Sequence, residues 1–250
     1  MYLCSITPVK QVKWMCEQPM MMCLTHLVEK YPEYAAAVAE SKAYKILDNS
    51  LVELGGAVEI DRVLAAADKI HADEIVLVDV YKDGHATVET VKKSIQWLRE
   101  HNYLGKYKLQ AVAHGSTKED FIYCFNALNA MPEVDVIAIP KVTVSYEWCG
   151  GRSRAGAYHI FKNTDKEIHF LGSWYNLAEL FELPGEVWDK VRSCDTCLPS
   201  LYVIQNKHVW EDREGTIDLE KDYPEMTKEK YDAVMAEMEQ QVIKHQLHLG

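Results

Sequence analysis

Eight short runs rich in Val, Ile and Leu recur along the chain, and each ends at a polar residue or at a Gly or Pro. Runs of this length and composition are typical of buried β-strands. Most are followed by a stretch in which apolar residues recur at helical spacing, as at Val88, Val91, Ile95 and Leu98. The predicted strands are Tyr2–Ile6, Met20–Thr25, Tyr44–Asn49, Glu74–Asp79, Lys108–His114, Val134–Pro140, Glu167–Gly172 and Val191–Thr196.

Strands that alternate with helices form a parallel sheet with right-handed crossovers, and eight of them can close into a barrel. We therefore predict an α/β fold, a (β/α)8 TIM-like barrel, with helices over Asp61–His71, Thr87–His101 and Thr117–Met131. The connection after the first strand is too short for a standard helical crossover, and Ser145–Phe161 has no clear periodicity. Some irregularity in the barrel is therefore expected.

The pattern changes after Pro199, where an acidic segment precedes a helix predicted from Lys228 to about Leu247. No internal repeat or low-complexity linker interrupts the chain. We therefore predict one domain over residues 1–250, with the barrel in about 1–200 and a C-terminal acidic and helical appendage in about 201–250.

The composition indicates the class of protein and the cellular compartment that we expect. The 250 residues are 48% hydrophobic and 26% charged, which suits one substantial core. No apolar run approaches the ~20 residues needed to span a bilayer, and the first residues lack the pattern of a signal peptide. Seven scattered cysteines favour free thiols in a reducing compartment. We expect a cytoplasmic protein with no membrane partner.

The charge is unevenly distributed. Asp and Glu outnumber Lys and Arg by 38 to 27, and a net charge of −11 repels polyanions at long range. Much of the acidity lies between Glu211 and Glu239. The charge disfavours a general nucleic-acid coat protein, but it permits an enzyme that holds nucleic acid with a local basic strip.

Polar residues at the ends of the predicted strands are the candidates for chemistry, because active sites of such barrels lie where the strands end. Asp48, Asp79, Asp195 and His114 stand at four of these ends. A single Asp at a strand end more often caps the next helix or opens a turn. Three carboxylates and an imidazole at one end of the barrel weaken that simpler interpretation without removing it. The same edge carries Pro140, Lys141, Leu171 and Gly172.

Four segments resemble motifs of the tRNA-guanine transglycosylases. "YKILDNS" is similar to the start of their D-S-G-G-type motif and "AVAHGS" to their V-Q-G segment. "EIHFLG" is similar to H-Y-L-M-G, and "RSCDTCLP" to F-D-C-x-L-P. The order matches from about Met1 to Pro199, and the resemblance is closest to the smaller bacteriophage relatives (the DpdA group) that insert 7-deazaguanines into DNA.

The resemblance implies an exchange of guanine in DNA for a 7-deazaguanine base (preQ0-like) through a covalent glycosyl-enzyme. Asp195 matches the nucleophile, and Asp48 matches the carboxylate that protonates the departing guanine and deprotonates the incoming base. Asp79 matches the aspartate that reads the guanine-like edge.

The rest of the base pocket follows from the same resemblance. His114 stands where the tRNA enzymes have a glutamine that contacts the base, and this departure leaves its contact open. The backbones around Pro140 and Lys141, and those of Leu171 and Gly172, would supply the wall and the edge.

The implied partners are DNA, with its target guanine flipped out or single-stranded, and the free 7-deazaguanine base. "CGGRSRAG" places Arg152 and Arg154 in a glycine-rich loop suited to phosphate contact, and Lys141 and Arg192 could extend the strip. A solvated loop without a nucleic-acid role is the alternative.

No cofactor is expected. Structural zinc needs four ligands, whereas Cys194 and Cys197 have only His208 as a further nearby candidate. The C-x-C-x-x-C that carries zinc in the tRNA enzymes is missing, so we interpret the two thiols as packing residues, although the sequence does not exclude zinc.

Other functions stay open. A tRNA-guanine or archaeosine-type transglycosylase would share Asp48, Asp79 and Asp195, and a non-catalytic partner that binds 7-deazaguanine or nucleic acid would need no nucleophile. A hydrolytic glycosidase also uses paired carboxylates. The sequence leaves a homodimer open.

Overall fold

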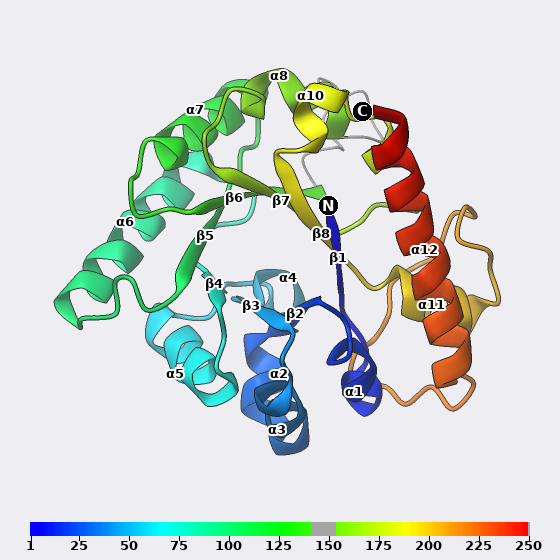
Figure 1. Cartoon of the computed structure of the whole chain (residues 1–250). Coiled ribbons are helices and arrows are strands. Elements are labelled where there is room, and N and C mark those ends of the chain that lie inside the picture. Colours follow the sequence, from blue (N-terminus) through cyan, green and yellow to red (C-terminus); the bar gives the residue numbers. More distant parts are fainter. Residues whose placement is uncertain (142–153, 250) are drawn as a thin grey trace.

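Eight parallel strands close into a barrel in the computed structural model, which describes residues 1–141 and 154–249 (Figure 1). Each strand pairs with the next in the chain, and β8 pairs with β1. The barrel predicted from the sequence is therefore confirmed. The strands are β1 Tyr2–Ser5, β2 Met20–Leu24, β3 Tyr44–Asp48, β4 Glu74–Val76, β5 Lys108–Val112, β6 Val136–Pro140, β7 Glu167–Leu171 and β8 Val191–Thr196.

Helices surround the barrel and cover its outer face (Figure 1). The longer ones are α2 Thr25–Lys30, α3 Pro32–Glu40, α5 Ile60–Ile70, α6 Gly84–Glu100, α7 Lys118–Asn129, α11 Leu198–Gln205 and α12 Lys228–Leu249. The short ones are η1 Val9–Gln11, α1 Val12–Met15, α4 Leu51–Leu54, η4 Arg154–Ala157, α8 Tyr158–Phe161, α9 Ala178–Phe181 and α10 Gly185–Trp188.

The irregular places also follow the sequence. Only η1 and α1 connect β1 to β2, as the short first connection predicts. Residues 142–153 of the irregular segment lie outside the described residues, and its described remainder forms the short helices η4 and α8. Strands β4 and β5 end earlier than predicted, so Asp79 and His114 stand in the loops just beyond them.

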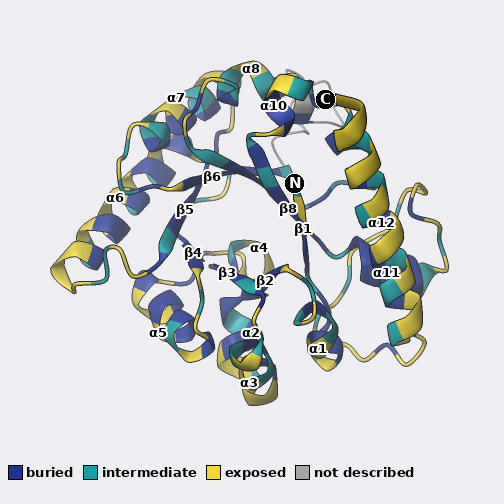
Figure 2. Cartoon of the chain, in the orientation of Figure 1, coloured by how far each residue is buried: buried dark blue, intermediate teal, exposed yellow. Residues whose placement is uncertain are grey.

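Apolar side chains fill two layers of space, one inside the barrel and one between the barrel and its helices. The predicted stripe of α6 is buried in the outer layer (Figure 2). Around a tilted barrel each strand is offset by about one residue from its neighbour. The strand register therefore places Cys4, Ile46, Gln110 and His169 in one interior layer, and Met22, Val76, Ala138 and Asp195 in the layer above it.

The C-terminal segment packs against the barrel. Helix α12 lies beside α11 (Figure 1), and its Tyr231 and Met235 pack with Val203. The Tyr231 hydroxyl also hydrogen-bonds to Ser5 of β1. The boundary predicted near residue 200 falls inside α11, so this helix links the barrel to the appendage. None of the described helices is long and apolar enough to cross a membrane.

Charged residues close the N-terminal end of the barrel. Arg192 lies where the β7–β8 register shifts, and its guanidinium reaches both Glu74 oxygens at 2.8 and 3.0 Å and Glu167 at 3.1 Å. Tyr44 donates to Glu74 at 2.8 Å, and Lys108 pairs with Glu167. We call these five residues the base cluster, after their place at the N-terminal end, or base, of the barrel. The prediction that Arg192 extends a nucleic-acid strip is wrong, because its charge is neutralised at the opposite end from the strand-end carboxylates.

Candidate active site

A cavity of about 410 Å³ opens at the C-terminal end of the barrel, here called the mouth. The residues predicted to act in catalysis or base binding all line it, although they come from six different strand ends or the loops after them. The fold thus brings together side chains that are up to 147 positions apart, from Asp48 to Asp195. These residues are Asp48, Asp79, His114, Pro140, Lys141, Leu171, Gly172 and Asp195.

Asp195 is held through one of its two carboxylate oxygens. Its Oδ1 accepts from the backbone N–H of Gly172 at 2.6 Å and lies 3.0 Å from Nε2 of His169. Gly172 has φ +74°, a left-handed conformation that side-chain-bearing residues rarely adopt. The glycine therefore turns its N–H toward the carboxylate at the point where β7 ends.

Asp48 has a different environment at the end of β3. Its Oδ2 accepts from the backbone N–H of Ser50 at 2.7 Å, and Thr25 donates to its backbone carbonyl at 2.7 Å. Burial raises the pKa of Asp48 well above its usual range. The negative charge of Glu53 raises this pKa further, whereas the N–H of Ser50 opposes the rise. Asp48 thus favours the protonated form more than an ordinary aspartate does.

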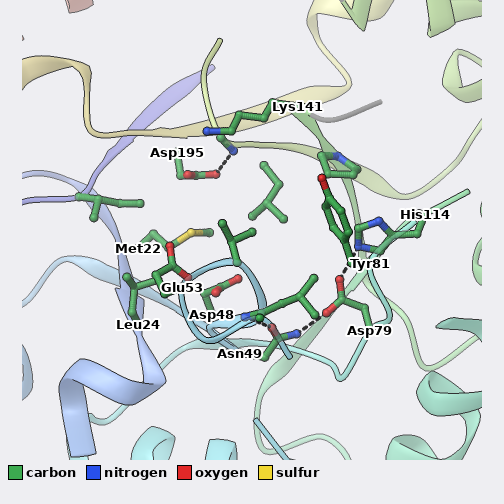
Figure 3. Close-up of a pocket in the computed structure, with 17 residues that line it drawn as sticks. Met22, Leu24, Asp48, Asn49, Glu53, Asp79, Tyr81, His114, Lys141 and Asp195 are labelled. Atoms are coloured by element: carbon green, nitrogen blue, oxygen red, sulfur yellow. Dashed lines mark hydrogen bonds and ion pairs between the residues drawn. The ribbon is translucent and has the colours of Figure 1, made fainter. Parts of the chain in front are cut away.

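Asp79 faces Asp195 from the other side of the pocket (Figure 3), because β4 and β8 are opposite strands of the barrel. Its Oδ1 accepts from Asn49 at 2.7 Å, and its Oδ2 lies 2.6 Å from Nε2 of His114. The backbone N–H of Lys82 donates to Nδ1 of His114 at 3.4 Å. This long contact assigns the ring proton to Nε2, so His114 donates to Asp79.

His114 therefore serves the pocket in a different way from the predicted base contact. Both of its ring nitrogens are engaged by protein groups, and the ring lies edge-on to Tyr81 at a centroid distance of 6.1 Å. His114 lines the pocket, but its hydrogen bonds orient Asp79.

Several residues that shape the pocket were not predicted from the sequence. Asn49 directly follows Asp48 and positions Asp79, while Glu53 of α4 adds a fourth carboxylate at the rim. Glu53 is exposed as a residue, but its carboxyl is directed inward (Figure 3), where desolvation and then the charge of Asp195 raise its pKa. Two-residue alternation along β7 would have pointed to His169, which faces inward like Leu171.

Arg154 is not a phosphate-binding residue, because it is fully buried. Its guanidinium pairs with Glu179 and donates to the carbonyls of Ile139 at 2.8 Å and Gly172 at 2.6 Å. It also lies over the ring of Phe170, 4.3 Å from the ring centroid. Arg154 thus joins the ends of β6 and β7. Its guanidinium also donates to the Leu171 carbonyl at 3.2 Å, and this bond holds the peptide that carries the Gly172 N–H.

Lys141 is the one cation among the described residues that line the pocket. Its aliphatic stem runs along Gly172, where an added Cβ would meet the Lys141 Cδ at 3.0 Å. Arg152, the other predicted phosphate contact, lies outside the described residues. The predicted basic strip therefore retains Lys141 alone among the residues whose positions are described.

The two thiols of the C-x-x-C are unlike one another. Cys194 is fully buried on β8, Cys197 is partly buried just beyond it, and burial raises the pKa of both. His208 is exposed. In residues 1–141 and 154–249, no three His, Cys, Asp or Glu side chains are grouped as metal ligands would be.

No protein-family model matches the chain, and no curated protein matches it.

Proposed function

We propose that the protein is a DNA-guanine transglycosylase that exchanges guanine for a 7-deazaguanine through a glycosyl-Asp195 intermediate. The observation that carries the proposal is a pair of pocket carboxylates with unlike environments. Asp195 accepts two hydrogen bonds on one oxygen, while burial and nearby negative charge raise the pKa of Asp48. Two carboxyl groups in unlike environments suit a nucleophile and a proton donor.

In the first displacement, an oxygen of Asp195 bonds to C1′ of the sugar as the bond from C1′ to the guanine nitrogen breaks. The bonding electrons leave with guanine, which takes a proton from Asp48. In the second displacement, the ring nitrogen of the incoming base attacks C1′, the ester bond breaks, and its electrons return to Asp195. Asp48 takes the proton of the incoming base, so both carboxyl groups end as they began.

Asp79 supports recognition of a guanine-like base. A carboxylate can accept from a ring N–H and an exocyclic amine together, as the guanine edge requires. Asn49 and His114 each donate to one Asp79 oxygen and so hold the carboxylate plane. Each oxygen keeps a second acceptor site for the base. A base read by Asp79 would direct its sugar toward Asp195 on the opposite strand.

DNA as the substrate rests on the resemblance to the bacteriophage relatives. A target guanine must leave the base stack to enter a pocket at the barrel mouth. The acidic mouth, with Lys141 as its one described cation, favours a second candidate: exchange on a free nucleoside, which needs no phosphate strip. A tRNA substrate and a non-catalytic base-binding role are further outcomes of the same test.

The test supplies the protein with a panel of 7-deazaguanines and four guanine donors: single-stranded DNA, duplex DNA, tRNA and deoxyguanosine. Mass spectrometry of the recovered nucleosides measures exchange. We expect 7-deazaguanine in DNA with wild-type protein and none with Asp195→Ala. Glu119→Gln, which alters an exposed carboxylate outside the pocket at the same barrel end, should act like wild type.

Exchange only in tRNA or only in deoxyguanosine would replace DNA as the substrate. Exchange retained by Asp195→Ala would remove the nucleophile assignment. Binding of free base without exchange on any donor would favour the non-catalytic role.

A further inference from the structure

We infer that His169 is a positioning residue that occupies Oδ1 of Asp195, leaves Oδ2 to attack the sugar, and favours breakdown of the glycosyl-enzyme. The inference rests on the proposed function and extends it to a residue below the pocket. His169 is fully buried in the barrel interior, in the layer beneath Asp195. It does not line the cavity.

A directed chain of hydrogen bonds assigns the proton on the His169 ring. Arg192 Nε lies 3.2 Å from the Ser193 hydroxyl, and an arginine only donates. The hydroxyl oxygen accepts from Arg192, so its own proton is free to go to Nδ1 of His169 at 2.8 Å. With Nδ1 accepting, Nε2 carries the proton of a neutral ring and donates to Asp195 Oδ1 at 3.0 Å.

The chain thus begins in the base cluster and ends at the candidate nucleophile. Each link has one orientation, because it starts from a group that cannot accept and ends on a carboxylate oxygen, which accepts when ionised. The direction of these hydrogen bonds keeps the Nε2–H of His169, rather than a ring lone pair, facing Asp195.

The same contacts distinguish the two oxygens of Asp195. Oδ1 accepts from both His169 and the Gly172 N–H, which fills its two acceptor sites. No hydrogen bond to Oδ2 is found within residues 1–141 and 154–249, and Asp195 lines the cavity. Oδ2 is therefore the oxygen with lone pairs available to form the bond to C1′.

Holding Oδ1 affects the two displacements in opposite directions. When Oδ2 bonds to C1′, the carboxylate loses its negative charge and Oδ1 becomes an ester carbonyl, so its hydrogen bonds weaken. When that bond breaks, the electrons return to the carboxylate and the hydrogen bonds strengthen. The N–H of His169 therefore makes Asp195 a better leaving group in the second displacement at some expense to the first.

Two variants separate this role from packing. His169→Leu removes the donor at similar volume, whereas His169→Gln can place an amide N–H near the original Nε2. The experiment uses wild-type and variant proteins with single-stranded DNA and a 7-deazaguanine, quenched in denaturant during turnover. Intact-protein mass and peptide mapping then measure the fraction of Asp195 that carries the nucleotide.

We expect overall exchange by His169→Leu to fall about 10- to 100-fold, as for loss of a hydrogen bond to a charged group. The adducted fraction should rise, because breakdown of the glycosyl-enzyme slows while its formation does not. His169→Gln should restore most of both values. Ser193→Ala should show a smaller shift of the same kind, and Ser94→Ala, which removes a buried hydroxyl on α6, should match wild type.

A purely structural role for His169 would lower the amount of active protein without changing the adducted fraction of that active protein. An unchanged fraction in His169→Leu would therefore overturn the inference and leave the proposed function standing. Absence of any Asp195 adduct in actively exchanging wild-type protein would overturn both together.

Discussion

Carboxylates at the two ends of the barrel have opposite electrostatic environments. At the base cluster, the carboxylates of Glu74 and Glu167 are paired with Arg192 and Lys108. At the mouth, Asp48, Asp79 and Asp195 are buried as Glu74 is, but the described groups that hydrogen-bond to their carboxylates are amide N–H donors and histidine rings. Within residues 1–141 and 154–249, hydrogen bonds thus orient the mouth carboxylates, and no lysine or arginine forms an ion pair with them.

The difference shows which end carries stability and which carries chemistry. Removing one partner of a buried ion pair leaves an uncompensated charge and strongly lowers stability, whereas crowded like charges raise the free energy of the folded state. The pKa of Asp48 is raised first by burial and then by the negative charge of Glu53, so its ionised form is disfavoured in the folded state. We expect substitutions in the base cluster to lower the stability of the fold and substitutions at the mouth to lower activity.

The largest effect is expected from Asp48→Asn, which should slow exchange about 10²–10⁴-fold by removing the proton donor. Because the pKa of Asp48 is raised, the wild-type protein keeps its proton at a pH where an ordinary aspartate is ionised. The wild-type rate should therefore fall as the pH rises through that raised pKa. The Asn variant should lack this limb in a pH profile of the exchange rate.

The same variant also tests the stability side of the comparison. Folded Asp48 binds a proton more tightly than the unfolded chain does, so its contribution to stability is lost as pH rises through the folded pKa. Asp48→Asn should then unfold at higher denaturant concentration than wild type at neutral pH, and the gain should disappear in acid. Equal stability at both pH values would contradict the crowding of charge at the mouth.

The next largest effect, a loss of stability, is expected from Glu74→Gln in the base cluster. This change keeps the shape of a fully buried side chain and removes the charge opposite Arg192. Breaking a buried pair in this way costs about 3–5 kcal/mol, with the lower end expected because Glu167 also contacts Arg192. Urea unfolding measures the loss. Exchange per folded molecule should change little, and a large loss of activity without destabilisation would reverse the comparison.

A smaller effect is expected from Asp79→Asn. Asn49 and His114 both donate to Asp79, and an amide offers only one oxygen to them. The new NH₂ group also faces an N–H of the guanine-like edge where the carboxylate offered an acceptor oxygen, which costs about 1–3 kcal/mol of base binding. Calorimetric titration with a 7-deazaguanine measures this loss. Unchanged affinity would remove Asp79 from base recognition.

The smallest effect is expected from Glu167→Gln, because its side chain is 45% exposed and its ion pairs are screened by water. The loss in unfolding free energy should be about 0–1 kcal/mol. Burial raises the pKa of Glu167, but Lys108 and Arg192 outweigh burial and lower it overall. The stabilisation should therefore be present at neutral pH and vanish as the pH falls through the lowered pKa. A difference between variant and wild type that grows in acid would contradict this sign.

Much of the site could be predicted because strand ends are visible in the sequence. The apolar runs ending at Asp48 and Asp195 place these residues at one end of a parallel barrel, whatever the details of the helices. Asn49 also ends one of these runs, and two-residue alternation along β7 turns His169 inward, but neither pattern indicates which side chain the residue contacts. Each acts through a side chain on a neighbouring strand or loop, Asp79 and Asp195 respectively, and that pairing depends on the register.

The arginines show the opposite case. Arg154 sits in a glycine-rich, polar stretch typical of a surface loop, yet its partner Glu179 lies 25 positions further along the chain and takes it into the interior. Arg192 lies only three residues before Asp195, but those residues carry it to the other end of the barrel. The composition around a residue does not indicate at which end of the barrel its position on the strand places it.

By itself, the sequence determined the barrel, its strand order and the carboxylates at its mouth, because these depend on the alternation of apolar runs with helical repeats. Only the tertiary structure decided which charges are neutralised. Whether a buried carboxylate meets a guanidinium, a histidine or a backbone N–H depends on side chains brought within about 3 Å by closure of the barrel. That proximity separates the paired base cluster from the unpaired carboxylates that we propose carry out the chemistry.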